Sequence, residues 1–129
     1  MLVIESYMDI SPGMGIGLFA KANILKGTKY WIRNEVFDKL ISKKQYESLD
    51  KLAADFTEIH GFLEVTQNWY LCCDNASFTN HSNFPNTKYY FDRDGLVKYG
   101  VASKNIISGE EIFCDYTKIC LTCKNGLNF

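Results

Sequence analysis

Short runs of apolar residues rich in β-branched and aromatic side chains recur along the chain, and polar turns separate them. Runs of about four to eight such residues are typical of β-strands. They cover residues 2–7, 16–20, 28–33, 62–65, 68–72, 88–91, 96–102 and 111–114. Asp94-Gly95, between two of these runs, has the composition of a hairpin turn. The pattern therefore predicts a mainly β protein.

One stretch in the first half of the chain has a helical period instead. Its apolar residues recur at positions i, i+3, i+4 and i+7, which places them on one face of a helix. They are Leu49, Leu52, Ala53 and Phe56. Ser42 and Gln45 have the spacing of a capping box that would begin this helix, and a shorter helix is expected over residues 35–41. We therefore predict a helical insert at about residues 35–58.

The chain also contains a weak internal repeat. An alanine, an asparagine, an isoleucine and a glycine recur in the same order and at the same spacing. The first copy is Ala20, Asn23, Ile24 and Gly27, and the second is Ala102, Asn105, Ile106 and Gly109. Four matches can arise by chance. A real repeat would use one strand-turn-strand element twice, in a β domain with approximate internal symmetry.

The composition is that of one compact domain. The chain has 129 residues, of which 47% are hydrophobic, and this length leaves little room for a second core. The formal net charge is −1, so the chain lacks the basic excess that direct nucleic-acid binding requires. No window approaches the roughly 18 apolar residues of a membrane span, and the N-terminal residues lack the features of a signal peptide. A soluble intracellular protein without a membrane partner is expected.

Three segments contain candidate chemistry. The first has Gly13, Gly15 and Gly17 at alternate positions before a strand. A phosphate-binding loop would lead into a helix instead, so two interpretations stay open. Either the bare backbone approaches a ligand, or the glycines form a bulge at a sheet edge.

The second segment, residues 77–87, reads SFTNHSNFPNT and could be a turn held by its own side chains, with His81 as a structural imidazole. The third segment, residues 108–117, reads SGEEIFCDYT and ends on Asp115-Tyr116. A tyrosine at the end of a strand is commonly a half-buried aromatic residue. Each segment by itself therefore has an ordinary structural explanation.

Together the three segments resemble the SET-domain protein lysine methyltransferases. A Gly-x-Gly before a strand, Asn-His-Ser-x-x-Pro-Asn and Gly-Glu-Glu-Ile-x-x-Asp-Tyr occur in the order and at the spacing of that family. The resemblance covers about residues 2–117 and is closest to small stand-alone SET proteins of bacteria and viruses. It implies a SET domain over residues 1–117, with the insert at 35–58 in the family's variable region, and a short C-terminal tail over 118–129.

The resemblance implies a β-clip-like fold of several small sheets with a knot-like, threaded C-terminal segment. It also implies transfer of methyl groups from S-adenosylmethionine to a lysine of a protein substrate, with Tyr116 as the catalytic tyrosine. The expected cofactor-binding residues are Met14, Gly15, Gly17, Phe78, Asn80, His81 and Tyr116. The expected lysine channel consists of Tyr70, Phe78, Cys114 and Tyr116. Trp31 is also a candidate wall, although a core position is favoured for it.

The chain departs from the family pattern at several positions. Ser77 stands where the family often has arginine, and Asn83 where many chromatin enzymes have a zinc-binding cysteine. Cys120 and Cys123 are two ligands of the four that structural zinc requires, so no metal is expected within one chain. The five cysteines are an odd number, which favours reduced thiols. Cys114, two positions before the catalytic tyrosine, is small, and the hypothesis is that it leaves room for dimethylation or trimethylation.

Several alternatives stay open. The adenine could be covered by C-terminal residues or by a second subunit, so the protein is expected to be a monomer or a homodimer. The candidate residues are Leu121, Leu127 and Phe129. A SET-fold binding module without turnover is the main rival, although joint retention of Asn80, His81 and Tyr116 favours an enzyme. A fortuitous motif match in another β domain is a second rival. We expect a cytoplasmic location in a bacterium, with delivery into a host or its nucleus as alternatives.

Overall fold

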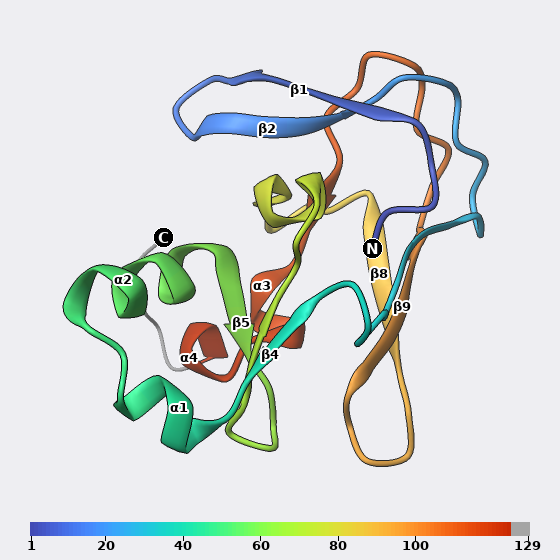
Figure 1. Ribbon diagram of the computed structural model, residues 1–129. Coiled ribbons are helices and arrows are strands. Elements are labelled where there is room, and N and C mark those ends of the chain that lie inside the picture. The colour runs from blue at the N-terminus through green and yellow to red at the C-terminus, as the bar shows by residue number, and fades with distance from the viewer. Residues whose placement is uncertain (125–129) are drawn as a thin grey trace.

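The largest share of the regular secondary structure lies in four small β-sheets, and most of the helices gather at one side of them (Figure 1). The computed structural model describes residues 1–124. The strands are β1 (Ser6–Ser11), β2 (Gly15–Ala20), β3 (Lys29–Ile32), β4 (Lys39–Ile41), β5 (Gly61–Leu63), β6 (Trp69–Leu71), β7 (Asn80–His81), β8 (Thr87–Phe91), β9 (Val97–Ala102) and β10 (Phe113–Cys114). The helices are α1 (Lys43–Glu47), α2 (Lys51–His60), the 3-10 helix η1 (Asn75–Phe78), α3 (Tyr116–Ile119) and α4 (Leu121–Lys124). The predicted mainly β fold is confirmed.

The sheets are the β1–β2 hairpin, the antiparallel sheets β3-β9-β8 and β4-β6-β5, and the parallel pair β7-β10. The hairpin predicted at Asp94-Gly95 joins β8 to β9. The parallel pair brings together two segments that lie far apart in sequence, since Phe113 pairs with Asn80 and Cys114 pairs with His81. The second and third motifs of the sequence therefore meet in β7 and β10.

The helix predicted over residues 35–41 is wrong. Residues 35–37 form a turn, and β4 follows it and pairs with β6, where Leu40 lies opposite Tyr70. The Asn34 side chain holds the turn, because its Oδ1 accepts the backbone N–H groups of the second and third residues after it at 3.1 Å. A free edge of β6 thus overrides the local helical pattern by offering backbone hydrogen bonds.

The predicted capping box is present, but it begins a shorter helix than expected. Ser42 Oγ accepts the Gln45 N–H at 3.2 Å, and Gln45 Oε1 accepts the Ser42 N–H at 2.9 Å, at the start of α1. A second cap at Asp50 then begins α2. The predicted apolar face of this helix points away from the core, since Leu52 is 82% exposed and Phe56 is 55% exposed.

The internal repeat is real in the structure, because its two copies pack against each other. Ile24 and Ile106 exchange two backbone hydrogen bonds of 2.8 Å. The glycine of each copy donates its N–H to the alanine carbonyl of the other, at 2.8 Å for Gly27 and 2.7 Å for Gly109. The asparagine of each copy accepts a backbone N–H of the other, Asn23 from Ser108 and Asn105 from Lys26, both at 2.8 Å. The reciprocal contacts relate the copies by an approximate two-fold axis.

The core lies between the β1–β2 hairpin, the β3-β9-β8 sheet and β6. Its fully buried large side chains include Leu18, Tyr30, Tyr70, Ile106 and Ile112. Two repeat positions, Ala20 and Ala102, are also fully buried. Among residues 1–124, no helix is long and apolar enough to cross a membrane.

Candidate active site

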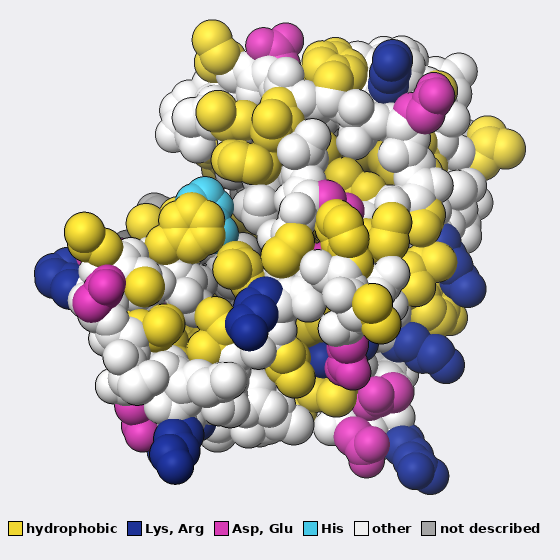
Figure 2. Space-filling model, viewed as in Figure 1, with side chains coloured by type: hydrophobic (Ala, Val, Ile, Leu, Met, Phe, Trp, Pro, Cys, Tyr) yellow, Lys and Arg dark blue, Asp and Glu magenta, His cyan; other side chains and the backbone are white. Residues whose placement is uncertain are grey.

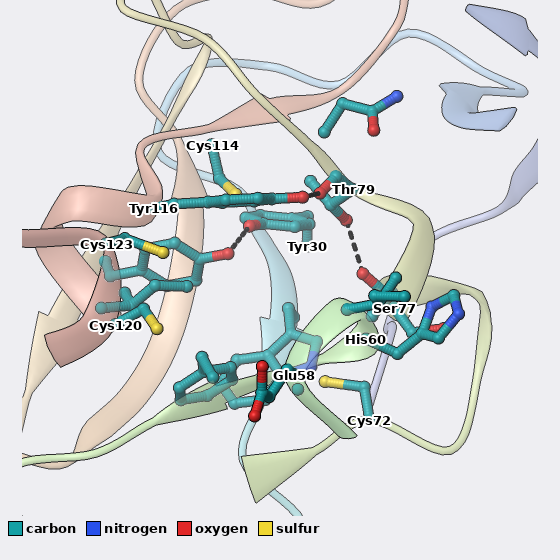
Figure 3. A pocket seen from close by; sticks show the side chains of 18 residues that line it. Tyr30, Glu58, His60, Cys72, Ser77, Thr79, Cys114, Tyr116, Cys120 and Cys123 are labelled. Carbon is teal, nitrogen blue, oxygen red and sulfur yellow. Dashed lines mark hydrogen bonds between the residues drawn. The ribbon is translucent and has the colours of Figure 1, made fainter. Parts of the chain in front are cut away.

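A cavity of about 440 Å³ lies where the helical insert, the parallel β7-β10 pair and the C-terminal helices meet (Figure 3). Its walls come from β3, β8, the α2–β5 junction, η1 with β7, and the segment that runs from Cys114 to Cys123. Figure 2 shows the surface hollowed between the β1–β2 hairpin and α2, with hydrophobic side chains gathered on the α2 side. The volume falls in the range of about 300 to 1,000 Å³ that small-molecule sites occupy.

Tyr116 points its hydroxyl group along one wall of this cavity. The hydroxyl donates a hydrogen bond of 2.6 Å to the carbonyl oxygen of Thr79 (Figure 3). Burial, with a smaller contribution from the nearby Cys114, raises the pKa of Tyr116 well above its usual value. The phenol therefore stays protonated at physiological pH and keeps donating to Thr79.

The backbone of Tyr116 is held by the second motif. His81 Nδ1 accepts the Tyr116 N–H at 3.1 Å, so Nδ1 lacks a proton in this contact. The other ring nitrogen, Nε2, lies 3.2 Å from Asn83 Oδ1 and can donate to it. The Ser82 N–H also donates to the carbonyl of Cys114 at 2.9 Å. Asn83, a departure from the chromatin enzymes, thus favours the imidazole tautomer that binds Tyr116.

Asn80 connects the same strand to the glycine-rich hairpin through Glu111. Its side-chain amide donates to Glu111 Oε1 at 2.9 Å and to the carbonyl of Ile16 at 3.1 Å. Ser11 Oγ donates to Glu111 Oε2 at 2.8 Å. A β-carbon on Gly17 would lie 2.8 Å from the Glu111 carboxyl carbon. The absence of a side chain at Gly17 therefore makes room for Glu111. Through its two carboxylate oxygens, Glu111 connects the β1–β2 hairpin to β7.

A second group of phenols and a thiol lies deeper in the cavity. Tyr30 donates to the hydroxyl oxygen of Tyr89 at 2.7 Å, and the Cys114 thiol lines the same part of the cavity. Burial raises the pKa of Cys114 to about 12, so the thiol stays neutral. Gly100 lies against both rings, because a β-carbon there would be 2.6 Å from Tyr30 and 3.0 Å from Tyr89.

The predicted site residues divide into three groups. Asn80, Cys114 and Tyr116 line the cavity. Met14 and His81 line a separate shallow hollow beside Phe113. The remaining ones lie outside both linings: Gly15 at the start of β2, Gly17 against Glu111, Phe78 with its ring 5.7 Å from that of His60, and Tyr70.

Tyr70 is a core residue in the structure and not a wall of the cavity. Its side chain is fully buried, and its hydroxyl donates to Asp38 at 2.6 Å and accepts the Asn34 N–H at 3.1 Å. Trp31, for which a core position was favoured, is 3% exposed and also lines the cavity.

Sequence reasoning missed several wall residues. These are Tyr30, Phe62, Cys72, Thr79, Tyr89, Cys120 and Cys123. Tyr30 and Tyr89 lie in predicted strands, but no local signal shows that the two strands flank β9 and turn these rings to the same side. Leu121, expected near the adenine, lines another hollow beside Glu64, and Leu127 and Phe129 lie outside the described residues. Within residues 1–124, no three or more His, Cys, Asp or Glu side chains are grouped to hold a metal ion.

Comparison with known proteins places this geometry in a family. A family model described as "SET domain" matches residues 15–117. The chain belongs to the SET-domain family. Membership confirms the resemblance seen in the three motifs, and the SET fold accounts for the small sheets and for the meeting of β7 with β10.

Solved structures share the fold of this SET domain. A humanized mutant of Polycomb Repressive Complex 2 from Chaetomium thermophilum, bound to an inhibitor, matches 96% of this chain with a TM-score of 0.67 and 19% identity. An apo ctPRC2 with two substitutions in Ezh2 matches 95% with a TM-score of 0.70 and 20% identity. This chain spans 16% of each of those chains. No curated protein matches the sequence.

Proposed function

We propose that this SET-domain protein transfers methyl groups from S-adenosylmethionine to a lysine side chain of a protein substrate. The observation that supports this most is the Tyr116 hydroxyl, half-buried in the wall of a cavity and aimed at the Thr79 carbonyl. When bound, S-adenosylmethionine would supply an electrophilic methyl group on a positively charged sulfur. The residues of the chain then have to bind this group and orient a neutral amine toward it.

The cavity suits a cationic cofactor and an amine. No lysine or arginine occurs among its described wall residues, and Glu58 is the acidic residue there. Among the described residues, five Tyr, Trp and Phe rings line it: Tyr30, Trp31, Phe62, Tyr89 and Tyr116. Aromatic faces attract cations, and a sulfonium or an ammonium group would therefore be stabilised here without a competing positive charge. Asn80 lies in the same wall and would contact the cofactor.

The Tyr116 hydroxyl and backbone carbonyl oxygens could orient the reacting groups. The Tyr116 hydroxyl donates its proton to the Thr79 carbonyl, and a phenol oxygen is also a hydrogen-bond acceptor, the role that the amine would require of it. Hydroxyl and carbonyl oxygens can also accept weak C–H···O contacts from a polarised methyl group. Removal of the lysine amine from water lowers its pKa, which favours the neutral, nucleophilic form. The reaction is an in-line displacement, so positioning would provide most of the rate increase.

Cys114 bears on how many methyl groups are added. It is 2% exposed, and it lies in the cavity wall beside Tyr89. A thiol in place of a large aromatic ring leaves space next to the amine, and this supports dimethylated or trimethylated products. Mass spectrometry of the product tests this point, and a strictly monomethylated lysine would contradict it.

The decisive experiment is transfer of labelled methyl groups from S-adenosylmethionine into a cell lysate. Wild type should label protein, and Tyr116→Phe should label it at least about tenfold less, because a loss of roughly 1.4 kcal/mol in the transition state already gives that factor. Tyr99→Phe makes the same change on β9, outside the cavity lining, and should keep wild-type labelling. Equal labelling by wild type and Tyr116→Phe would remove the proposed role of the hydroxyl.

A thermal shift with S-adenosylmethionine separates an enzyme from a binding module. A ligand that binds the native state raises the melting temperature. Stabilisation without any labelled product would favour a SET fold that binds without turnover. If S-adenosylmethionine neither raised the melting temperature nor gave labelled protein, the proposal as a whole would be contradicted.

A further inference from the structure

Two thiols of the C-terminal segment line the cavity close to Tyr116. The proposed methyl transfer does not use either of them. They are Cys120 and Cys123, whose sulfur atoms Figure 3 shows at the cavity wall. We propose that Cys120 and Cys123 form an oxidisable dithiol site that reacts with peroxides and closes to a disulfide. This inference goes beyond the proposed function, because it requires no methyl transfer.

The backbone brings the two thiols together. Cys120 ends α3 in an extended conformation with φ −116° and ψ 124°, and α4 begins with the next residue and contains Cys123. Both sulfur atoms lie at the same cavity wall (Figure 3), and each thiol shifts the pKa of the other. A disulfide needs a sulfur–sulfur distance of about 2.05 Å. Because both thiols face the same cavity and are three residues apart across the start of α4, we infer that side-chain rotation brings the sulfur atoms to this distance.

Hydrogen-bond donors converge on the sulfur of Cys120. The Leu63 N–H donates to it at 3.4 Å, and Thr122 Oγ1 lies 2.9 Å away. Burial opposes ionisation, but the donors outweigh it, so the pKa of Cys120 is lowered. Burial, followed by the influence of the neighbouring Cys120, raises the pKa of Cys123. Cys120 is therefore the more easily ionised thiol of the two, which suits it to be the nucleophile, and Cys123 suits the role of the resolving thiol.

Hydrogen peroxide would oxidise the pair in two steps. The Cys120 thiolate attacks one peroxide oxygen, an S–O bond forms, the O–O bond breaks, and the released hydroxide takes a proton to become water. Cys123 then attacks the sulfenic sulfur, the S–S bond forms, the S–O bond breaks, and the thiol proton leaves with the hydroxide as water. The two sulfur atoms lose two electrons in total, and the peroxide gains them.

The other cysteines are poorly suited to this chemistry. Burial raises the pKa of Cys72 to about 12 and that of Cys114 to about 12, which keeps both as unreactive thiols. Cys73 is exposed and adjacent to Cys72 in sequence, which makes it a natural control for a single accessible thiol.

Intact-mass spectrometry tests the site. Reduced, chelator-treated protein with a small excess of hydrogen peroxide should lose about 2 Da, the two thiol hydrogens, and peptide mapping should show a Cys120–Cys123 disulfide. Cys73→Ser should behave like wild type, whereas Cys120→Ser and Cys123→Ser should each abolish the loss of mass. Two independent variants keep the test valid if one of them fails to fold, which circular dichroism would show.

Three outcomes would overturn the proposal. Peroxide could add oxygen to Cys73 and leave the pair reduced, or mapping could find a disulfide of Cys114 with either partner. Native mass spectrometry before chelation could also show a zinc ion bound to the pair, which would make it a metal site. Since mass is the readout, failure here leaves the methyltransferase proposal unaffected, and the reverse also holds.

Discussion

Gly17 lies directly against the side chain of Glu111, and a β-carbon on the glycine would be 2.8 Å from the carboxyl carbon. This carboxylate accepts hydrogen bonds from Ser11 in the hairpin and from Asn80 in β7. The glycine-rich segment and the Asn-His segment are therefore connected through one acidic side chain from the third motif.

Gly17→Ala should displace Glu111 and break both hydrogen bonds. Hydrogen bonds to charged groups contribute about 1.5 to 3 kcal/mol each, so a drop of about 1 to 3 kcal/mol in the free energy of unfolding is expected after relaxation. Urea denaturation measures this. In a Glu111→Ala background, Gly17→Ala should lower the free energy of unfolding by less, because the new methyl group no longer overlaps the Glu111 carboxyl group. Equal costs in both backgrounds would contradict the coupling.

Asn83→Ala should loosen the contact between His81 and the Tyr116 backbone. Without the Oδ1 acceptor, the Nε2–H tautomer loses this hydrogen bond, and the tautomer whose Nδ1 accepts from Tyr116 becomes less populated. A single hydrogen bond of about 1 kcal/mol predicts a roughly fivefold shift in tautomer ratio. Nitrogen-15 chemical shifts of the imidazole measure it. Asn83→Asp keeps an acceptor and should retain the Nε2–H form, whereas an unchanged ratio in Asn83→Ala would contradict this role.

Gly100→Ala should push the Tyr30 and Tyr89 rings into the cavity. The new methyl group would be 2.6 Å from the ring of Tyr30, which is buried, and 3.0 Å from the ring of Tyr89, which is half-buried. Overpacking of a core typically costs about 1 to 3 kcal/mol. Thermal denaturation with and without S-adenosylmethionine should show lower stability and a smaller shift by the ligand. Wild-type values in both measurements would show that the rings can move away from the cavity.

Stability should fall as the pH rises above about 8.5, the usual pKa of a free thiol. The folded state raises the pKa of Cys72 and Cys114 to about 12, so their contribution is full below the unfolded pKa and is lost between the two values. Each thiol contributes up to about 1.4 kcal/mol per pH unit in this window. Urea denaturation between pH 7.5 and 10 measures the slope. Cys114→Ala should make that slope less steep, and a flat profile in wild type would contradict the assignment.

Local sequence determined several features, because these features depend either on residues that are neighbours in the chain or on a short sequence pattern that occurs twice. The capping box at Ser42 and Gln45, the hairpin at Asp94-Gly95 and the reciprocal Ile24–Ile106 element all depend on a few residues at set spacing. The family, too, was recognisable from three motifs, because each of them fills a fixed place in the SET fold.

Tertiary structure decided the rest. Tyr70 and Tyr89 both lie in predicted strands, yet Tyr70 faces Asp38 in the core while Tyr89 faces the cavity. Residues 39–41 became a strand because β6 offered an edge, and Gly17 was needed to make room for Glu111. Which face of a strand meets a cavity depends on how sheets pack, and such contacts between distant segments leave no periodic signal in the sequence.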